Sequence, residues 1–196
     1  MTKLRPDLAV IARNIPAGAR VLDIGCGDGL LMEELRDERG ADARGLELVP
    51  ERVELCVSKG LSVIQGDADR DLADYPDDAF DYAILSQTLQ TANRPDHMLD
   101  ELLRIGRRAF VSFPNFAFWR MRLSLLVNGR MPVTPHLPVS WYETENIHHL
   151  TIADFRALLD AKGVKVEGSW FFTHDREIGS SGANWRAEHA VFQLSR

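Results

Sequence analysis

Residues 21–31 read VLDIGCGDGLL, an apolar run that ends in an aspartate and leads into three glycines at alternate positions. The run predicts a buried strand over residues 19–24, and the LLMEELRDERG segment after it predicts a helix that ends at Gly40. A strand followed at once by glycines and a helix turns backbone N–H groups and a positive helix end toward the carboxyl edge of a sheet. The stretch therefore predicts a binding site for a polar ligand.

The rest of the chain alternates short β-branched runs with longer amphipathic stretches, an order typical of a parallel sheet with crossover helices. The last two predicted strands form an antiparallel pair at the sheet edge. We expect one α/β domain, residues 1–196, with a mostly parallel seven-stranded sheet, an antiparallel terminal strand and helices on both faces. Besides residues 19–24, the strands are expected over residues 43–48, 61–67, 80–85, 107–113, 164–173 and 188–195, and further helices over 5–15, 51–60, 96–105 and 151–163.

Composition narrows the class of function. The 196 residues are 45% hydrophobic, which is enough for one core, and the net charge of −6 argues against a general nucleic-acid binder. Two cysteines far apart in the sequence predict neither a disulfide framework nor a metal site. The start, MTKLRPDLAV, has no secretory apolar region, and the longest apolar stretch is too short to span a bilayer. We expect a reduced, cytoplasmic protein that binds no membrane, no nucleic acid and no metal.

The spacing of the glycines argues against a dinucleotide. The dinucleotide fingerprint is G-x-G-x-x-G, whereas Gly25, Gly27 and Gly29 form G-x-G-x-G. Asp23 and Asp28 would also place negative charge beside a phosphate. A ligand with an ammonium group and no phosphate suits the loop better, so a nicotinamide-dependent oxidoreductase is the less favoured class.

Acidic residues follow the next two predicted strands. Glu47 ends the second strand, where a carboxylate can accept hydrogen bonds from two ribose hydroxyls. Gly66, Asp67 and Ala68 end the third strand, where a carboxylate and an open backbone can meet an adenine edge. Each feature alone has an ordinary explanation as a turn or a solvated loop. Three consecutive strand ends that each supply a group for adenosine together predict an adenosine pocket.

With these motifs the sequence resembles the class I S-adenosylmethionine-dependent methyltransferases, which have a Rossmann-like fold. DIGCGDG looks like their first motif, Glu47 their acidic residue after the second strand, and FDYAILSQTLQ their fourth motif. The resemblance implies that S-adenosyl-L-methionine or S-adenosyl-L-homocysteine is bound, with Leu48 on the adenine and Ser86 or Gln87 near the sulfonium. The implied cofactor residues are Asp23, Gly25, Cys26, Gly27, Asp28, Gly29, Glu47, Leu48, Gly66, Asp67, Ala68, Ser86 and Gln87.

The same resemblance leaves catalysis open. Many small-molecule methyltransferases carry a histidine shortly after the fourth strand, and here the sequence SQTLQT puts Thr91 at that position. FPNF, which contains Phe113 and Asn115, follows the fifth strand rather than the fourth, unlike the motif of amino-methylating enzymes. The most obvious general base is therefore missing.

The segment WYETENIHHLT, residues 141–151, offers other substrate and lid candidates beside Phe113 and Asn115. Aromatic rings can surround a sulfonium and a histidine can act as a base, so the candidates are Trp141, Tyr142, Asn146 and His148, with His148 as the catalytic candidate. The alternative is that the two aromatic residues pack the segment on the core and the histidines, His149 included, lie at the surface.

Residues 113–150 interrupt the regular pattern and are expected to form an inserted lid or interface segment with a short helix of its own. Apolar and basic side chains at helical spacing make this helix a candidate partner surface, formed by Trp119, Arg120, Arg122, Leu123 and Leu126. A lid, a docking surface and a patch for an anionic substrate remain open, as does an ordinary amphipathic helix that covers the sheet.

The second half also resembles a narrower family. SFPNFAFWRMRLSLLVNGRMPVT and LPVSWYETENIHHLTIADF look like the signature region of the MetW family of methionine-biosynthesis proteins, and the similarity covers nearly the whole chain. This resemblance implies a bacterial protein that works beside homoserine O-acyltransferase as a supporting or regulatory partner. The alternative is an active methyltransferase on a small, carboxylated metabolite.

Overall fold

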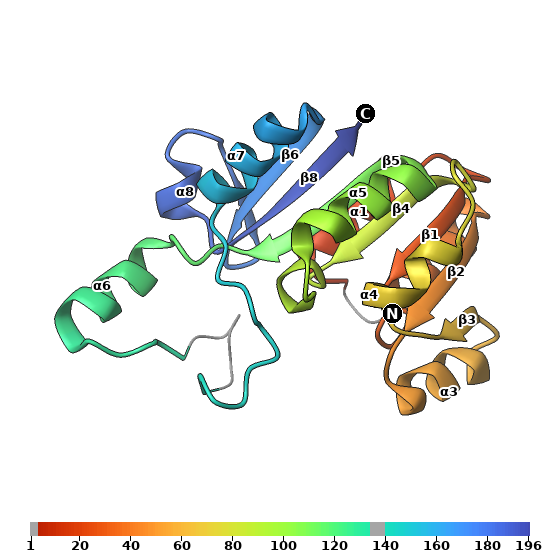
Figure 1. Ribbon diagram of the computed structural model, residues 1–196, viewed down its shortest axis with the longest axis horizontal. Helices are drawn as coiled ribbons and strands as arrows, with labels where there is room; N and C mark the ends of the chain where they lie inside the picture. Colours follow the sequence, from red (N-terminus) through yellow and green to blue (C-terminus); the bar gives the residue numbers. More distant parts are fainter. Residues whose placement is uncertain (1–3, 134–139) are drawn as a thin grey trace.

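The strand before the glycine loop lies near the centre of one sheet in the computed structural model, which describes residues 4–133 and 140–196 (Figure 1). The strand order is β3-β2-β1-β4-β5-β8-β6-β7. Neighbours from β3 to β5 are parallel, and β8 runs antiparallel to both β5 and β6. The strands are β1 (Arg20–Ile24), β2 (Asp42–Glu47), β3 (Ser62–Gln65), β4 (Phe80–Ser86), β5 (Gly106–Pro114), β6 (Lys165–Thr173), β7 (Arg176–Ile178) and β8 (His189–Ser195).

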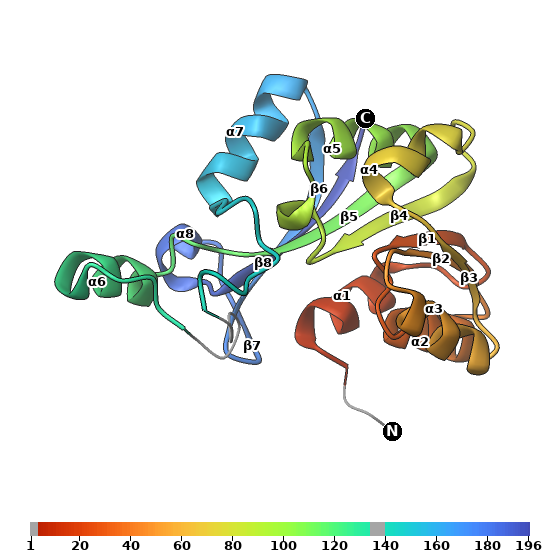
Figure 2. The same cartoon turned by 60° about the horizontal axis from the view of Figure 1, so that its bottom comes forward.

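Helices lie on both faces of the sheet, as the sequence predicts. In Figure 2, α1, α2 and α3 lie on one side and α4, α5 and α7 on the other. The helices are α1 (Pro6–Asn14), α2 (Leu30–Arg39), α3 (Pro50–Ser58), α4 (Ala68–Asp71), α5 (Pro95–Ile105), α6 (Trp119–Asn128), α7 (Ile152–Lys162) and α8 (Ala183–Arg186), with 3-10 turns η1 (Leu72–Asp74) and η2 (Leu89–Thr91). The predicted α/β architecture is confirmed.

Alternation along the central strands explains why both faces are covered. In β4, Tyr82 and Ile84 join the core beneath α1 and α2, whereas Ala83 and Leu85 join the core beneath α5 and α7. Successive side chains of a strand point to opposite faces, so the apolar run from Tyr82 to Leu85 must be buried on both sides. This burial fixes the strand ends at which the ligand loops begin.

The eighth strand and the short helices are the differences from the sequence prediction. β7 pairs with the end of β6 over three residues, which is too short for a recognisable pattern. α4 and α8 have four residues each, and α4 occupies the acid-rich stretch that reads as a loop. Its N-cap, Asp67, accepts a hydrogen bond from the backbone N–H of Asp69, so local capping decides this helix.

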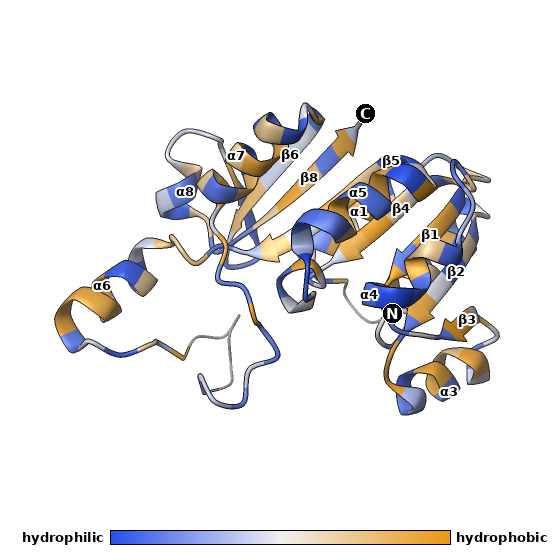
Figure 3. Cartoon of the chain, viewed as in Figure 1, coloured by the Kyte–Doolittle hydropathy of each residue, from blue (hydrophilic) through white to orange (hydrophobic). Residues whose placement is uncertain are grey.

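Helix α6 of the inserted segment does not cover the sheet. α6 extends away from the sheet and its helices, joined to the end of β5 by a short loop (Figure 1). Hydrophobic colour marks its outer turns (Figure 3). Of the expected segment 113–150, residues 134–139 lie outside the described residues. None of the helices in the described ranges is long and apolar enough to cross a bilayer.

Candidate functional site

A cavity of about 680 Å³ opens at the carboxyl ends of β1 to β4. This is where the strand order reverses between β1 and β4, the usual ligand position in an open α/β sheet. Twelve of the thirteen residues expected around a cofactor line it, and Gly29 is the exception. The twelve are Asp23, Gly25, Cys26, Gly27, Asp28, Glu47, Leu48, Gly66, Asp67, Ala68, Ser86 and Gln87.

The three glycines of the loop differ in what a side chain would contact at each position. All have positive φ, which side chains disfavour. A Cβ on Gly25 would lie 2.6 Å from the Thr88 Oγ1, and one on Gly29 would lie 2.4 Å from the Leu61 Cδ1, so both permit close packing. A Cβ on Gly27 would have no described atom within 4 Å and Gly27 lines the cavity. Gly27 therefore leaves room for a ligand, whereas Gly29 lets α2 begin close to Leu61.

Glu47 is buried and holds the loop from the end of β2. Its Oε2 accepts a hydrogen bond of 2.8 Å from the Gly27 N–H, and its Oε1 accepts one of 2.9 Å from the Val49 N–H. Each carboxylate oxygen has a second lone pair, so the group can still accept from two hydroxyls. Glu47 thus holds the loop and also lines the cavity.

Asp23 is the most perturbed acid of the cavity. Its side chain is 2% exposed and its Oδ1 has no hydrogen-bond partner among the described residues. Burial raises the pKa of Asp23 to about 7, opposed by the Arg5 guanidinium and reinforced by Glu47. A buried carboxylate with an unused oxygen is costly unless a cation meets it. The position favours a ligand that carries an ammonium group.

The other end of the cavity is formed by the Gly66–Asp67–Ala68 turn. The Asp67 N–H donates to the Asp71 Oδ2 at 2.7 Å, and a Cβ on Gly66 would lie 2.6 Å from that same oxygen. Leu48, which is 61% exposed, lines the cavity at the end of β2, the strand that pairs with β3 before this turn. An exposed leucine at a cavity rim offers an apolar surface to a flat ring.

Ser86 belongs to a network that sequence reasoning did not predict. Its hydroxyl donates to the buried Asp7 Oδ2 at 3.2 Å and accepts from the Arg5 Nη2 at 3.0 Å, while Ser112 also donates to Asp7. The network ties the start of α1 to the ends of β4 and β5. Gln87, the next residue, has a φ of 55° and its N–H donates to the Ser112 carbonyl.

The substrate and lid candidates are not brought to the cavity. Phe113 is fully buried against Phe155 and Phe192, because β5 crosses the core there. Asn115 is buried too, and its amide nitrogen donates to the Asn184 and Ala187 carbonyls. These contacts give both side chains a structural role, and neither residue lines the cavity.

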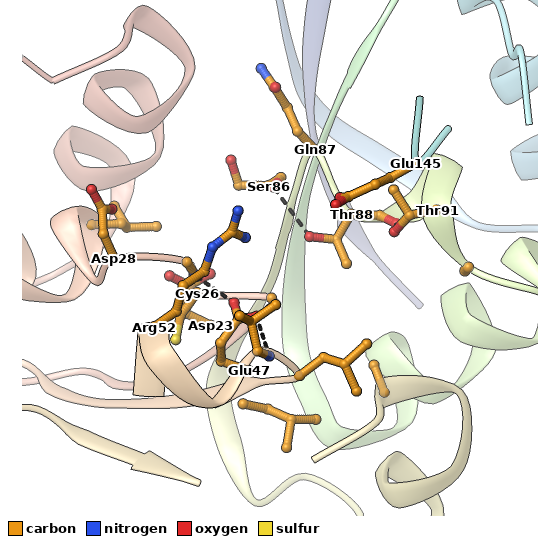
Figure 4. A pocket seen from close by; sticks show the side chains of 18 of the residues that line it. Asp23, Cys26, Asp28, Glu47, Arg52, Ser86, Gln87, Thr88, Thr91 and Glu145 are labelled. Carbon is orange, nitrogen blue, oxygen red and sulfur yellow. Dashed lines mark hydrogen bonds between the residues drawn. The ribbon is translucent and has the colours of Figure 1, made fainter. Parts of the chain in front are cut away.

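The aromatic pair of the 141–151 segment lies at the surface. Trp141 and Tyr142 are 75% and 70% exposed, and their rings contact each other edge to face. Among the described residues, neither these rings, Asn146 nor His148 line the cavity. The His148 Nε2 is buried without a hydrogen-bond partner among the described residues. The segment instead contributes Glu145 to the cavity wall (Figure 4).

Several residues that line the cavity could not be recognised from the sequence. Arg5 lies 81 residues from its partner Ser86, and Arg52 is an unremarkable charge on a helix. Thr88 and Thr91 stand after β4, and each hydroxyl donates to a backbone carbonyl. Of these four residues, only Thr91 stands out in the sequence, where it occupies the position of a histidine in many small-molecule methyltransferases.

The two cysteines lie together despite their separation in the sequence. Cys26 and Cys56 share one buried cluster with Met32 and Leu61, and both thiols are free. Burial raises the pKa of both thiols, so both stay protonated. Cys56 packs behind the loop, where its thiol donates to the Gly27 carbonyl at 3.3 Å, whereas Cys26 belongs to the loop and also lines the cavity.

The residues of the candidate partner surface on α6 do not all point outward. Trp119, Leu123 and Leu126 are 38%, 48% and 82% exposed, and the Arg120 guanidinium lies over the Trp119 ring. Arg122 instead holds the helix to the body, because its Nε donates to the Ala117 carbonyl and its guanidinium lies over the Trp185 ring. The outward face is apolar with one basic side chain.

The fold is that of the class I methyltransferases. An S-adenosylmethionine-dependent methyltransferase from Mesorhizobium loti superposes with a TM-score of 0.70 at 18% identity, covering 97% of this chain and 96% of that one. The chain belongs to the family of the methionine biosynthesis protein MetW, whose model matches residues 5–194. The family resemblance of the sequence is confirmed.

Two curated relatives add context. The bifunctional methionine biosynthesis protein MetXA/MetW of Rhodopirellula baltica is 36% identical over 98% of this chain, which spans a third of that relative's length (33%). A ubiquinone biosynthesis O-methyltransferase of Xylella fastidiosa is 38% identical over 82% of this chain and 67% of its own length.

Proposed function

We propose that the chain binds S-adenosyl-L-methionine or S-adenosyl-L-homocysteine in the cavity and supports or regulates homoserine O-acyltransferase in methionine biosynthesis. The main observation in favour of this cofactor is the buried Asp23. Its Oδ1 has no hydrogen-bond partner among the described residues and could accept a hydrogen bond from the ammonium group of the ligand. Glu47 would hold the ribose hydroxyls and Asp67 with Ala68 the adenine edge, with Leu48 against the ring. Bound there, the cofactor would supply an activated methyl group.

Space and charge support the same ligand. Gly27 leaves open volume beside the loop, and Ser86 and Gln87 lie at the end of β4 beyond it. Six carboxylates against two guanidiniums line the cavity, which disfavours a pyrophosphate-bearing dinucleotide. Calorimetry with S-adenosylmethionine, S-adenosylhomocysteine and NAD tests this part. Binding of NAD alone would contradict it.

The partnership rests on the fused relative. MetXA and MetW occur in one chain in the Rhodopirellula protein, and we take MetXA to be the homoserine O-acyltransferase that the family resemblance implies. We place the contact on the outward face of α6, because Trp119, Leu123 and Leu126 are exposed apolar side chains with the exposed Arg120 beside them. We expect the complex to form in the cytoplasm.

Turnover of the acyltransferase tests the partnership. The purified acyltransferase is assayed alone, with this protein, and with this protein plus S-adenosylmethionine. A change in rate on mixing supports a supporting role, and a further change with the cofactor supports regulation. No complex on gel filtration and no change in rate would contradict the proposal.

An active methyltransferase on a small, carboxylated metabolite is the second candidate. The similarity to ubiquinone biosynthesis O-methyltransferases favours it. Against it stands Thr91, a weak base whose hydroxyl already donates to the Thr88 carbonyl at 2.8 Å. Formation of S-adenosylhomocysteine in a pool of carboxylated metabolites would decide for this candidate.

A further inference from the structure

Residues 140–150, called the strap here, run from the α6 region back to α7 and contribute one side chain to the cavity. The Ile147 and His148 N–H groups both donate to the Gln90 carbonyl at 3.0 Å, and the Phe116 N–H donates to the Leu150 carbonyl at 3.2 Å. Gln90 belongs to η2 and is buried. These bonds hold the strap against the turn that follows β4, with Glu145 facing the cavity.

Glu145 lies at the end of the cavity that Thr88 and Thr91 line. Figure 4 shows its side chain directed toward the end where Thr88 and Thr91 lie. Thr88 packs on the glycine loop, since a Cβ on Gly25 would lie 2.6 Å from its Oγ1, and its hydroxyl donates to the Ile24 carbonyl. This end, called the loop end here, is where Thr88 meets the glycine loop. Thr88 directly follows Ser86 and Gln87, which the family resemblance puts near the sulfonium, so the sulfur of an adenosylmethionine bound as proposed is expected at this end.

The charges around Glu145 leave its carboxylate available. Glu145 is exposed and forms no ion pair with the residues that the structure describes. Arg5, one of the two cavity guanidiniums, is engaged by Asp7 and Ser86. Arg52, the other, lies on α3 at the β2 side of the cavity. A cationic ligand group at the loop end can therefore interact with the Glu145 carboxylate, because no described arginine or lysine side chain is already paired with that carboxylate.

We propose that Glu145 makes the site discriminate by charge between S-adenosylmethionine, whose sulfonium is cationic, and S-adenosylhomocysteine, whose thioether is neutral. The inference rests on the proposed cofactor site. Attraction between the carboxylate and the sulfonium favours the methylated form and holds the strap against η2 when that form is bound.

Calorimetry with both ligands tests the proposal in the full-length protein. For the Glu145→Gln variant we expect affinity for S-adenosylmethionine to fall about 3- to 10-fold while affinity for S-adenosylhomocysteine changes less than about 2-fold. Glu145→Lys should reduce the ratio of the two affinities further. Glu143→Gln is the matched control, because Glu143 lies in the same strap but does not line the cavity, and its ratio should equal that of the wild type.

The outcomes separate the two proposals. Binding of both ligands with the same ratio in wild type, Glu145→Gln and Glu145→Lys would overturn the role of Glu145 and leave the cofactor site intact. Equal losses for both ligands would likewise overturn charge discrimination. Failure of the wild-type protein to bind either ligand would contradict the proposed function itself, and the inference with it.

Discussion

The Glu47 Oε2 accepts a 2.8 Å hydrogen bond from the Gly27 N–H, which joins the end of β2 to the middle of the glycine loop twenty residues earlier. Both groups line the cavity. The bond means that the proposed ribose ligand also holds the loop in shape, so its loss acts on the protein and on the ligand together.

Replacement of Glu47 separates these two effects. Glu47→Ala should weaken binding of S-adenosylmethionine by about 1–3 kcal/mol, because the ribose hydroxyls lose their acceptor. It should also lower the free energy of unfolding by about 1–3 kcal/mol, because the Gly27 and Val49 N–H groups lose theirs. Calorimetry and chemical denaturation measure the two terms, and unchanged affinity would mean that the ribose lies elsewhere.

Asp23 predicts that binding depends on pH. Its pKa of about 7 in the free protein means that the ionised form, which an ammonium group needs, becomes scarce in acid. Affinity for S-adenosylmethionine should fall roughly tenfold from pH 7 to pH 5.5. Asp23→Asn should bind weakly with a flat profile over that range. An equally steep profile in the variant would assign the dependence to another group.

The same carboxyl group makes a prediction about stability without ligand. The pKa of Asp23 is higher in the folded protein than its ordinary value of 3.8, so the folded state binds the proton more tightly. The stabilising contribution of the protonated form is complete below about pH 4 and is lost as the pH rises through 7. Between pH 5 and pH 8, wild type should lose ~1–3 kcal/mol relative to Asp23→Asn. Thermal unfolding at the two pH values measures this difference, and parallel behaviour would contradict it.

Gly27 and Gly40 have nearly the same backbone conformation, so alanine variants at the two positions separate an effect on ligand binding from an effect on the turn. Gly27 and Gly40 have φ of 60° and 58°, and a Cβ on either has no described neighbour within 4 Å. Alanine at either position should cost about 1 kcal/mol of stability because of the positive φ. Gly27→Ala alone should reduce cofactor affinity, since Gly27 lines the cavity and Gly40 ends α2. Equal affinities in the two variants would place the ligand away from the loop.

The exposed face of α6 predicts a loss of partner binding without a loss of folding. Leu123→Asp with Leu126→Asp should change the free energy of unfolding by less than about 1 kcal/mol, since both side chains are exposed. The double variant should no longer bind the acyltransferase or change its rate, while affinity for the cofactor is retained. Val57→Asp, at an equally exposed site on α3, is the control. Full activity of the double variant would move the interface elsewhere.

Much of the cofactor half could be predicted from the sequence because its signals are local. The VLDI run and the glycines determine a strand, a turn and a helix start within eleven residues, and Glu47 and Asp67 end strands whose apolar patterns are evident. The carboxyl ends of parallel strands must meet at one edge. The pattern and the family resemblance together therefore predicted part of the cavity lining. Gly29 does not line the cavity, because it packs against Leu61.

What only the tertiary structure decided depends on burial and on contacts between distant segments. Asp23 becomes a perturbed acid only when the folded chain encloses it, and Phe113 and Asn115 become core residues only when β5, α7 and α8 pack together. Glu145 reaches the cavity because its strap bonds to the Gln90 carbonyl, 55 or more residues earlier in the chain. Local patterns determine strands, turns and helix starts, whereas the loss of water around a charge and the meeting of distant loops are properties of the whole fold.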